Sequence, residues 1–518
     1  MSFKIKIIVF ISLLSVMSCK RKVDADILII NGMVYTGIDK APDNTVIAVN
    51  NDTISFIGDK KDATITANKV IDASGFIVCP GFIDPHTHAD RDLNDPERSD
   101  NKPFLFQGTT TVVVGNDGDS YYPVSKYRDL YTKQGVGSNV ILLTGQGTIR
   151  NEVIGNSNRP ASPEEIAAMK QIAQQEMDAG AFGISTGLFY APGGYADTEE
   201  VIALAKVIAE NDGIYDTHLR DESSYSVGLI NAVNEAIEIG EKAKIPIHIS
   251  HIKCLGVDVW KESDTIIKLI NNARKNGIAI SANQYPYEAS ATGLIAATVP
   301  RWVESGGKDS ILVRYQDKRF TQKILHETNE NITRRGGPEK LLIVNAEDQE
   351  LIGKTLKDIA EEMNLTPEKT VFEIIKNNNI RIASFNMSDY DIRNFMKQEW
   401  VVTGSDGNTG HPRKYGTFPK KYNTYVKQEK LIDLNRFINN STAETAKILK
   451  IPNRGVLKEG YFADVIIFDP ETFKDKADYT HPFELSEGLV YSIINGQIAV
   501  ENGSFTGGKY GKVLSKKQ

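Results

Sequence analysis

Two histidines spaced by one residue, His86 and His88, stand at the end of an apolar run that reads Pro80-Gly81-Phe82-Ile83-Asp84-Pro85. Residues i and i+2 of a β-strand point to the same face, so we expect both imidazoles to face one side. Imidazole nitrogens are frequent ligands of zinc and related metals. A His-x-His pair alone is a weak signal, but its place at the end of a hydrophobic strand favours a metal site.

Two more histidines close two more predicted strands, since His218 ends the run 214–218 and His251 ends the run 246–251. Each of them alone would more often be a satisfied core histidine. Four histidines at strand ends argue against coincidence and predict a shared metal centre. His248 lies three positions before His251, which places it on the other face of the strand, and we interpret it as structural.

A carboxylate, Asp406, ends a further predicted strand and is followed by Gly407. An isolated Ser-Asp-Gly sequence is more often a turn. Beside a metal-bound water, however, a carboxylate can accept the water's proton and return it to a leaving nitrogen. The histidines and Asp406 together therefore predict a metal-dependent hydrolase of C–N bonds.

The middle of the chain, 76–450, alternates buried strands with amphipathic helices. One helix has a complete start signal, with Ser162 as N-cap, Pro163 in the first turn and two glutamates after it, and it is expected to stop at Gly180. Such alternation predicts a parallel α/β architecture, and the number of units fits a (β/α)8 TIM-type barrel, whose sites lie at the carboxyl ends of its strands.

One strand too many is predicted in this middle part. Either 278–284 or 381–386 is expected to lie outside the barrel, and the irregular stretch of about 293–342 is expected to be a small inserted region.

The two ends of the chain, 26–75 and 451–518, read as short β-strands with turns between them. The pair Asn31-Gly32 is a strong hairpin signal. We expect both ends to form one composite β-sandwich domain beside the barrel.

Residues 1–19 have a different character, with Lys4 and Lys6 followed by a short apolar stretch that ends in Ser18-Cys19. This pattern is typical of a bacterial lipoprotein signal peptide, cleaved before Cys19, which then carries the lipid. The expectation is an exported protein of the bacterial cell envelope that meets the membrane only through its lipid anchor. An uncleaved N-terminal anchor helix is the alternative.

The 518 residues are 41% hydrophobic and 25% charged, which is an ordinary globular composition. The formal net charge is −7, and this lack of basic excess argues against nucleic acid as a partner. The two other cysteines, Cys79 and Cys254, define no disulfide framework and are interpreted as small buried hydrophobic residues.

The strand-end histidines and Asp406 resemble the pattern of the amidohydrolase superfamily. A finer resemblance, to the D-aminoacylase (N-acyl-D-amino-acid deacylase) family, spans nearly everything after residue 26. The motifs that carry it include Gly187-Leu188-Phe189-Tyr190-Ala191-Pro192-Gly193, His218-Leu219-Arg220-Asp221-Glu222, Ser250-His251-Ile252-Lys253, Gln284-Tyr285-Pro286-Tyr287-Glu288-Ala289-Ser290 and His411-Pro412-Arg413-Lys414-Tyr415-Gly416-Thr417-Phe418-Pro419.

This resemblance implies one or two zinc ions and a role for each matching residue of this chain. Asp406 becomes the general acid/base, and Tyr190 becomes a hydrogen-bond donor to the oxygen of the scissile carbonyl. The implied metal ligands are His86, His88, His218 and His251, and the candidates for gripping substrate carboxylates are Lys253, Tyr287, Ser290 and Arg413.

Two positions depart from the family's pattern. Asp117 stands where the family usually has a metal-binding cysteine, and Asn283 stands where aspartate is common. We expect Asp117 to be a metal ligand that is harder than a cysteine, able to shift metal preference or to be shared by two metals. Asn283 is expected to weaken the support of the metal ligands.

The predicted reaction is hydrolysis of the amide bond of an N-acyl-D-amino acid, which releases a carboxylate and a D-amino acid. The expected partner is a small molecule, an N-acyl amino acid or a dipeptide. A dipeptidase or a cyclic amidase, such as a hydantoinase or a dihydroorotase, is the alternative on the same scaffold, although Lys253 and Arg413 favour an open-chain substrate with a free carboxylate. A non-catalytic, lipid-anchored binding protein is disfavoured, because binding needs no proton shuttle such as Asp406.

Overall fold

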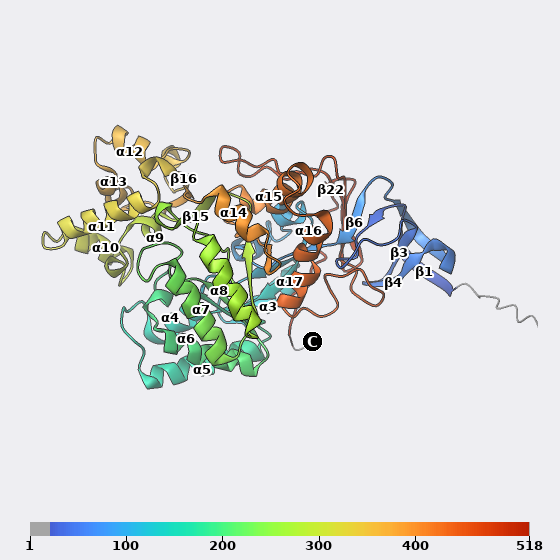
Figure 1. Cartoon of the computed structure of the whole chain (residues 1–518), viewed down its shortest axis with the longest axis horizontal. Coiled ribbons are helices and arrows are strands. Elements are labelled where there is room, and N and C mark those ends of the chain that lie inside the picture. Colours follow the sequence, from blue (N-terminus) through green and yellow to red (C-terminus); the bar gives the residue numbers. More distant parts are fainter. Residues whose placement is uncertain (1–20, 517–518) are drawn as a thin grey trace, which may run out of the picture.

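A computed structural model describes residues 21–516 (Figure 1). The predicted signal peptide and its lipidation site, Cys19, lie outside the described residues. No helix within residues 21–516 is both long enough and apolar enough to cross a membrane.

The centre of the molecule is a set of parallel strands in sequence order, which confirms the predicted α/β class. The strands are short and almost wholly buried, as their apolar sequences require. Only Leu143 separates β9 from β10, and a parallel bridge between Thr87 and Gly407 joins the two outermost strands, β7 and β18. The strands are β7 (Phe82–Asp84), β8 (Thr109–Val114), β9 (Asn139–Leu142), β10 (Thr144–Gly145), β11 (Gly183–Gly187), β12 (Ile214–His218), β13 (Ile247–Ile249), β14 (Ile280–Gln284) and β18 (Val401–Thr403).

Helices follow these strands. Helices α1 to α8 and α14 share one hydrophobic core with them, whereas α15, the π-helix and α16 pack in a second core and α17 in a third. The predicted start at Ser162 is confirmed as a complete capping box, with Ser162 and Glu165 bonded to each other's backbone amides. The helices are α1 (Asp90–Leu93), α2 (Lys102–Leu105), α3 (Val124–Gln134), α4 (Gln146–Ile154), α5 (Pro163–Asp178), α6 (Thr198–Glu210), α7 (Leu229–Ala243), α8 (Ser263–Lys275), α14 (Asp389–Met396), α15 (Arg413–Lys420), a π-helix Lys421–Gln428, α16 (Leu434–Ser441) and α17 (Ala443–Ile448).

A separate lobe, yellow to orange in Figure 1, interrupts the alternation between β14 and β18. The segment 381–385 lies here, in an antiparallel sheet, whereas 280–284 belongs to the parallel set. The lobe has a core of its own and covers 289–385, so the predicted insertion 293–342 is part of a longer segment. Its elements are β15 (Ala289–Gly293), α9 (Leu294–Thr298), α10 (Lys308–Gln316), α11 (Thr321–Arg334), β16 (Leu341–Asn345), α12 (Leu356–Glu362), α13 (Pro367–Ile374) and β17 (Arg381–Phe385).

Two sheets lie at the opposite side of the molecule from this lobe (Figure 1). One contains strands from the N-terminal part only, and the other combines strands from both ends of the chain. β6 pairs antiparallel with β19, and apolar side chains of both sheets form one core. One sheet holds β1 (Arg21–Ile30), β3 (Thr45–Asn50), β4 (Thr53–Asp59) and β5 (Ala63–Asp72), and the other holds β2 (Met33–Val34), β6 (Ile77–Pro80), β19 (Val465–Phe468), β20 (Leu489–Ile494), β21 (Gln497–Glu501) and β22 (Ser504–Phe505).

The hairpin predicted at Asn31-Gly32 is wrong. Asn31 does take the left-handed turn conformation, with φ of 63°, but β1 and β2 on either side of the turn belong to different sheets. The long strand β1 pairs instead with β5 in parallel and β3 in antiparallel orientation, which satisfies both of its edges. Cys79 and Cys254 are free and buried, as predicted.

Candidate functional site

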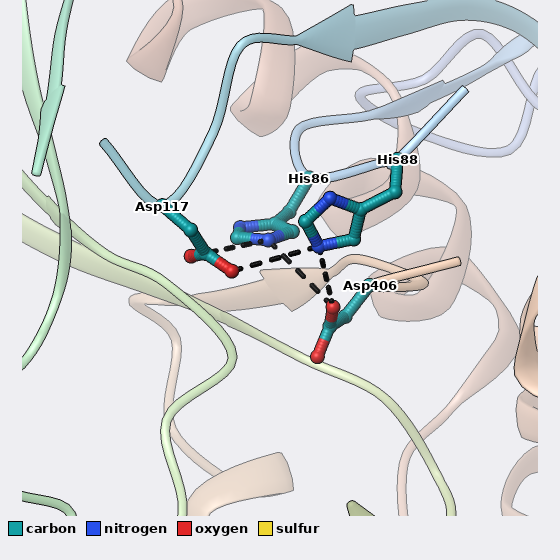
Figure 2. Close-up of side chains that lie close together, drawn as sticks. All are labelled: His86, His88, Asp117 and Asp406. Carbon is teal, nitrogen blue, oxygen red and sulfur yellow. Dashed lines mark hydrogen bonds and ion pairs between the residues drawn. The ribbon is translucent and has the colours of Figure 1, made fainter. Parts of the chain in front are cut away.

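Four side chains that were predicted from the sequence converge at the carboxyl ends of β7, β8 and β18 (Figure 2). Nε2 of His88 lies 3.1 Å from Oδ1 of Asp406 and 3.5 Å from Oδ2 of Asp117. Nε2 of His86 lies 3.5 Å from Oδ1 of Asp117 and 3.8 Å from Oδ1 of Asp406. The two histidines leave β7 in the turn after its last residue, so the chain brings two imidazoles and two carboxylates around one point.

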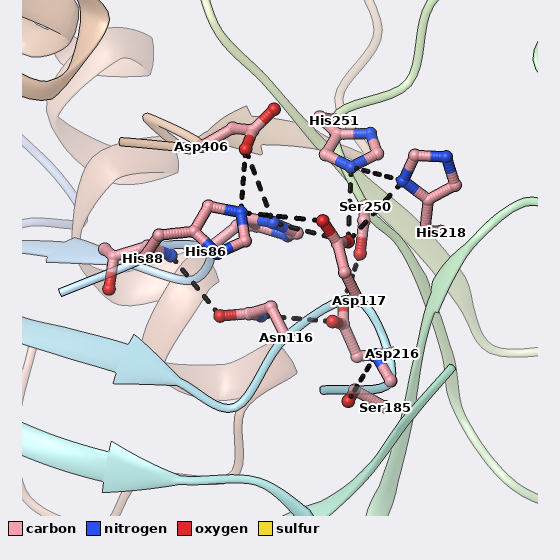
Figure 3. A network of polar contacts seen from close by, with 12 residues as sticks. His86, His88, Asn116, Asp117, Ser185, Asp216, His218, Ser250, His251 and Asp406 are labelled. Atoms are coloured by element: carbon pink, nitrogen blue, oxygen red, sulfur yellow. Dashed lines mark hydrogen bonds and ion pairs between the residues drawn. The ribbon is translucent and has the colours of Figure 1, made fainter. Parts of the chain in front are cut away.

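Asp117 also faces two histidines from neighbouring strands (Figure 3). Its Oδ1 lies 3.6 Å from Nδ1 of His218 and 3.3 Å from Nε2 of His251. These two imidazole nitrogens lie 3.0 Å apart. One carboxylate is therefore common to two groups of ligand atoms, the arrangement that a bridging ligand between two metal ions would have.

Three of these residues have a positive φ, a backbone conformation that residues other than glycine rarely adopt. Asp117 has φ of 58°, His251 of 33° and Asp406 of 49°. Each stands two or three residues after a buried strand, in the turn that follows the strand end. Non-glycine residues at positive φ cost free energy and cluster at functional sites.

The donor set fits a transition metal such as zinc. Both ring nitrogens of His86 are buried without a hydrogen-bond partner, which is costly unless a ligand completes them. Burial lowers the pKa of His86 to about 4, so its ring is neutral and able to coordinate. Burial also acts to lower the pKa of His88, but Asp117 and Asp406 outweigh burial and raise that pKa to about 10. The two carboxylates therefore favour a positive charge at this position.

Buried polar residues that the sequence analysis did not single out hold the ligand loops in place. Asp84 accepts from the backbone N–H of His86 at 3.2 Å and from that of Ser405 at 3.0 Å, which ties β7 to the loop that carries Asp406. Burial raises the pKa of Asp84 to about 7. Asp84 belongs to the Pro-Gly-Phe-Ile-Asp motif, and its position two residues before His86 could have indicated this supporting role from the sequence.

Asp216 performs a similar task between β8 and β13. Its carboxylate accepts from Nδ2 of Asn116 at 3.1 Å and from the hydroxyl of Ser250 at 3.0 Å, the residues before Asp117 and His251 (Figure 3). Burial raises its pKa to about 7.

Asn283, the second departure from the family's pattern, forms two buried hydrogen bonds. Its Oδ1 accepts from the backbone N–H of His251 at 2.9 Å, and its Nδ2 lies 2.9 Å from Nε2 of His248. Burial lowers the pKa of His248 to about 3, so this histidine is neutral and can accept from the amide. Thus Asn283 supports one predicted metal ligand, His251, through that residue's backbone, and His248 has the structural setting that its strand position predicted.

The predicted acid/base residue, Asp406, is 5% exposed and faces Arg413 as well as the histidines. Nη2 of Arg413 lies 2.7 Å from Oδ2 of Asp406 as an ion pair, although its orientation does not make it a hydrogen bond. Burial acts to raise the pKa of Asp406, but the charges of Arg413 and the histidines outweigh it and hold that pKa well below its usual range. Asp406 is therefore ionised and able to accept a proton.

Two spaces meet at this cluster. A narrow space, called the enclosed cavity below, is lined by His218, His251 and Asp406, and a larger and more open cleft is lined by His88 and Asp117. Tyr190 and Thr292 line both spaces, with their hydroxyl groups 3.4 Å apart. Burial and the nearby Asp117 raise the pKa of Tyr190, so its hydroxyl keeps its proton and can donate.

The predicted carboxylate-gripping residues are only partly brought together. Lys253 and Ser290 line the enclosed cavity. Tyr287 does not; its hydroxyl is buried without a partner, and its ring packs against His411. Tyr285, two positions earlier in the same motif, lines the cavity instead. Both residues lie in the irregular segment between β14 and β15, where the rule that residues i and i+2 share one face of a strand does not apply.

Arg413 lines neither space. It is fully buried between Asp406 and the ring of Tyr285, which lies 4.4 Å from its guanidinium carbon. In this arrangement Arg413 holds the carboxylate of Asp406, the predicted acid/base residue, and sequence spacing does not reveal this contact.

Glu222 ends the motif His218-Leu219-Arg220-Asp221-Glu222, and the sequence indicated no separate role for it. Its Oε1 accepts from Nζ of Lys253 at 2.6 Å and lies 3.1 Å from Nδ1 of His251. Burial acts to raise the pKa of Glu222, but Lys253, His218 and His251 outweigh it and hold that pKa well below its usual range. This carboxylate orients the ring of His251 from behind, as partners of metal-ligating histidines do.

Comparisons with known proteins agree with this geometry. The family model described as "Amidohydrolase family" matches residues 69–500. The chain is 31% identical to the D-aminoacylase of Alcaligenes xylosoxydans xylosoxydans over 95% of this chain and 98% of that protein, and 30% identical to the N-acyl-D-aspartate deacylase of the same organism over 90% and 91%. The crystal structure of N-acyl-D-glutamate deacylase from Bordetella bronchiseptica, complexed with zinc and a phosphonate mimic of the tetrahedral intermediate, is 27% identical with a TM-score of 0.82, covering 95% of this chain and 100% of that one.

Proposed function

The chain belongs to the amidohydrolase family, and from that premise we propose that it hydrolyses the amide bond of N-acyl-D-amino acids and releases a carboxylate and a D-amino acid. The observation that carries the proposal is a single carboxylate, Asp117, held against four histidines between an enclosed cavity and an open cleft. The sequence relatives named as deacylases of N-acyl-D-amino acids, at 28–31% identity, support the same reaction.

Zinc is the cofactor that we propose, as one or two ions. His86, His88, Asp117 and Asp406 would hold one ion, and Asp117, His218 and His251 would hold the other. When bound, zinc lowers the pKa of water and polarises a carbonyl. A solved D-aminoacylase structure described as having a binuclear metal centre, 29% identical with a TM-score of 0.80, supports two positions.

The proposed roles of the chain's own residues follow from their contacts. Asp406, ionised and aimed into the enclosed cavity, accepts the proton of the attacking water and returns it to the leaving nitrogen. Tyr190 donates its hydroxyl proton in a hydrogen bond to the oxygen of the scissile carbonyl, where negative charge develops. Lys253 and Ser290 orient the amino-acid carboxylate in the enclosed cavity, and the acyl group extends into the open cleft.

Arg413 stays a candidate for the substrate's carboxylate. Its guanidinium nitrogens have no hydrogen-bond acceptor in the structure, so they retain donors for a ligand. Arg413 would reach that ligand only if its contact with Asp406 is exchanged for one with substrate.

The finer architecture is part of the proposal. We place a (β/α)8 TIM-type barrel at 76–450, closed by the bridge between Thr87 and Gly407. We place a composite β-sandwich in 26–75 and 451–518, whose two sheets share one apolar core.

The proposed location is the bacterial cell envelope. It rests only on the lipoprotein pattern of residues 1–19 and on Cys19 as the lipidated residue. Labelling of cells with a fatty-acid analogue should mark the wild-type protein and leave Cys19→Ala unmarked, and equal labelling of both would contradict this location.

The enzymatic proposal is tested with zinc-loaded protein and paired N-acetyl-D- and N-acetyl-L-amino acids. We expect amine release from the D series. In Asp406→Asn we expect kcat to fall by about 1000-fold while zinc content is retained, because the amide cannot shuttle the proton. Unchanged kcat in this variant, or no amine release from any acyl amino acid, would contradict the proposal.

Two rival functions have distinct outcomes in the same screen. Release of amino acids from dipeptides alone would favour a dipeptidase, and ring opening of hydantoins or dihydroorotate alone would favour a cyclic amidase. Tight binding of an acyl amino acid without turnover would favour a non-catalytic binding protein.

A further inference from the structure

The enclosed cavity beside the predicted metal ligands contains a guanidinium group without an acidic partner, that of Arg335. Arg335 directly follows α11 in the inserted lobe and is 1% exposed. Its Nε donates to the hydroxyl of Tyr225 at 2.5 Å. With the Asn386 amide in the orientation that satisfies its neighbours, Nη1 of Arg335 donates to the amide oxygen at 3.2 Å. Throughout residues 21–516, no carboxylate forms an ion pair with this guanidinium.

The two other buried cations near the site differ in this respect. Nζ of Lys253 forms an ion pair with Oε1 of Glu222 at 2.6 Å, and Nη2 of Arg413 forms one with Oδ2 of Asp406 at 2.7 Å. A buried charge without a counter-ion carries a large free-energy cost, which a bound anion offsets. The planar fork of an arginine matches a carboxylate with two parallel hydrogen bonds, so a carboxylate is the anion that suits Arg335 best.

The rest of the cavity suits a short aliphatic stem that ends in that carboxylate. Phe189, Tyr225 and Leu255 provide aromatic and aliphatic walls, and His218, His251 and Asp406 mark the reacting end. A side chain of one or two methylene groups would contact these walls while its acidic end meets the guanidinium.

Arg335 also lies outside the motifs to which the family resemblance assigns the α-carboxylate. Those motifs supply Lys253 and Ser290, and both line the same cavity. Oγ of Ser290 lies 3.2 Å from the side-chain amide of Asn386, and the oxygen of the same amide accepts a hydrogen bond from Nη1 of Arg335. One polar network therefore links Ser290 to Arg335.

We propose that Arg335 binds the side-chain carboxylate of the substrate, so that the site takes N-acyl derivatives of acidic D-amino acids, D-glutamate and D-aspartate. This inference rests on the proposed deacylase function and specifies its substrate class. Arg335 is then the specificity-determining residue for the side chain, while Lys253 and Ser290 orient the α-carboxylate.

The test compares N-acetyl-D-glutamate with N-acetyl-D-glutamine, which has nearly the same shape but no side-chain charge. In the zinc-loaded full chain, kcat/KM should be higher for the glutamate substrate. Arg335→Met should lower kcat/KM for the glutamate substrate by about 100-fold, the scale of a lost charge-assisted pair, and change it far less for the glutamine substrate.

The matched control is Arg319→Met, which removes a guanidinium of the same lobe that does not line the cavity and that pairs with Asp317 at the surface. It should leave the ratio of the two kcat/KM values unchanged. Arg335→Lys keeps the charge without the fork and should keep a reduced preference for the glutamate substrate, which covers the case in which Arg335→Met does not fold.

Three results separate the possible failures. Equal losses for both substrates in Arg335→Met, with zinc content and melting temperature retained, would mean that Arg335 binds the α-carboxylate and would overturn the inference. Wild-type preference for neutral N-acetyl-D-amino acids would also overturn it and leave the proposed function standing. Absence of any deacylation by the wild type would overturn the proposed function itself.

Discussion

At the scale of single residues, Asp117 distinguishes this site from the family pattern to which the chain is otherwise similar. A cysteine thiolate presents one soft donor atom, whereas Asp117 presents two hard oxygens, and the structure uses both. Oδ2 faces His88, and Oδ1 faces His86, His218 and His251. Hard donors favour borderline and hard cations over thiophilic ones, so the metal preference should shift accordingly.

Substitution of Asp117 tests its role as the common ligand. Asp117→Ala should lose both bound ions, with affinity reduced by more than about 100-fold, because it removes a donor from each ligand group. Asp117→Cys should retain metal and, with cobalt, show a thiolate-to-metal charge-transfer band in the near ultraviolet that the wild type lacks. Metal content after dialysis and absorption spectra are the measurements.

The control for these variants is Asp119→Ala, which removes a carboxylate that lines the open cleft but belongs to neither ligand group. It should keep full metal content. Retention of both ions by Asp117→Ala would contradict the bridging position.

At the scale of elements, short parallel strands deliver ligands from several distant segments because buried polar side chains tie their terminal loops together. Asp84 links β7 to the loop after β18, and Asp216 links the loops after β8 and β13. Neither carboxylate belongs to a predicted ligand group, yet both are almost fully buried. Their burial is stabilised by hydrogen bonds that fix the turns on which the ligands stand.

Asp216→Ala tests this linkage. Loss of the acceptor for Asn116 and Ser250 should loosen the turns before Asp117 and His251 together. We expect metal affinity to fall by about 10- to 100-fold, as for other partners of metal ligands, with a smaller change in melting temperature. Competition with a chromogenic chelator measures the affinity, and wild-type affinity would show that Asp216 has no positioning role.

At the scale of the whole molecule, the π-helix Lys421–Gln428 packs the side chain of Lys421 into the interior at the end of β18. Nζ of Lys421 donates to the hydroxyl of Thr403 at 3.0 Å, and no carboxylate of residues 21–516 forms an ion pair with it. Burial lowers the pKa of Lys421 to about 7, from an ordinary value of 10.5. The folded protein therefore holds this lysine largely neutral above neutral pH.

Lys421→Met should stabilise the protein at pH 7 by roughly 1 to 4 kcal/mol, because it replaces a buried cation with an apolar chain of similar volume. Between about pH 7 and 10.5, the unfolded wild type binds a proton that the folded state does not bind, so its free energy of unfolding rises with pH from this residue. The variant should lack that rise, and the stability difference should shrink as pH increases. Thermal unfolding at several pH values measures it, and parallel curves would contradict the prediction.

The local patterns of the sequence were enough to predict the α/β class and the histidines at strand ends. The period of apolar residues reports which side of a strand or helix is buried, and a capping box such as Ser162–Glu165 is complete within four positions. His86, His88, His218 and His251 were therefore identified before their positions were known, as was Asp406 at the end of a further predicted strand, and family resemblance added Tyr190.

Contacts between distant segments were decided only by the tertiary structure. Asn31-Gly32 forms a turn but no hairpin, because strand pairing depends on which edges are free and not on the turn alone. Tyr285 lines the cavity and Tyr287 does not, and Arg413 meets Asp406, because side-chain direction depends on backbone angles that similar motifs do not specify. The inserted lobe brings Arg335 to a cavity whose other residues lie on the parallel strands and their loops, and such a contact becomes visible only when both parts are folded together.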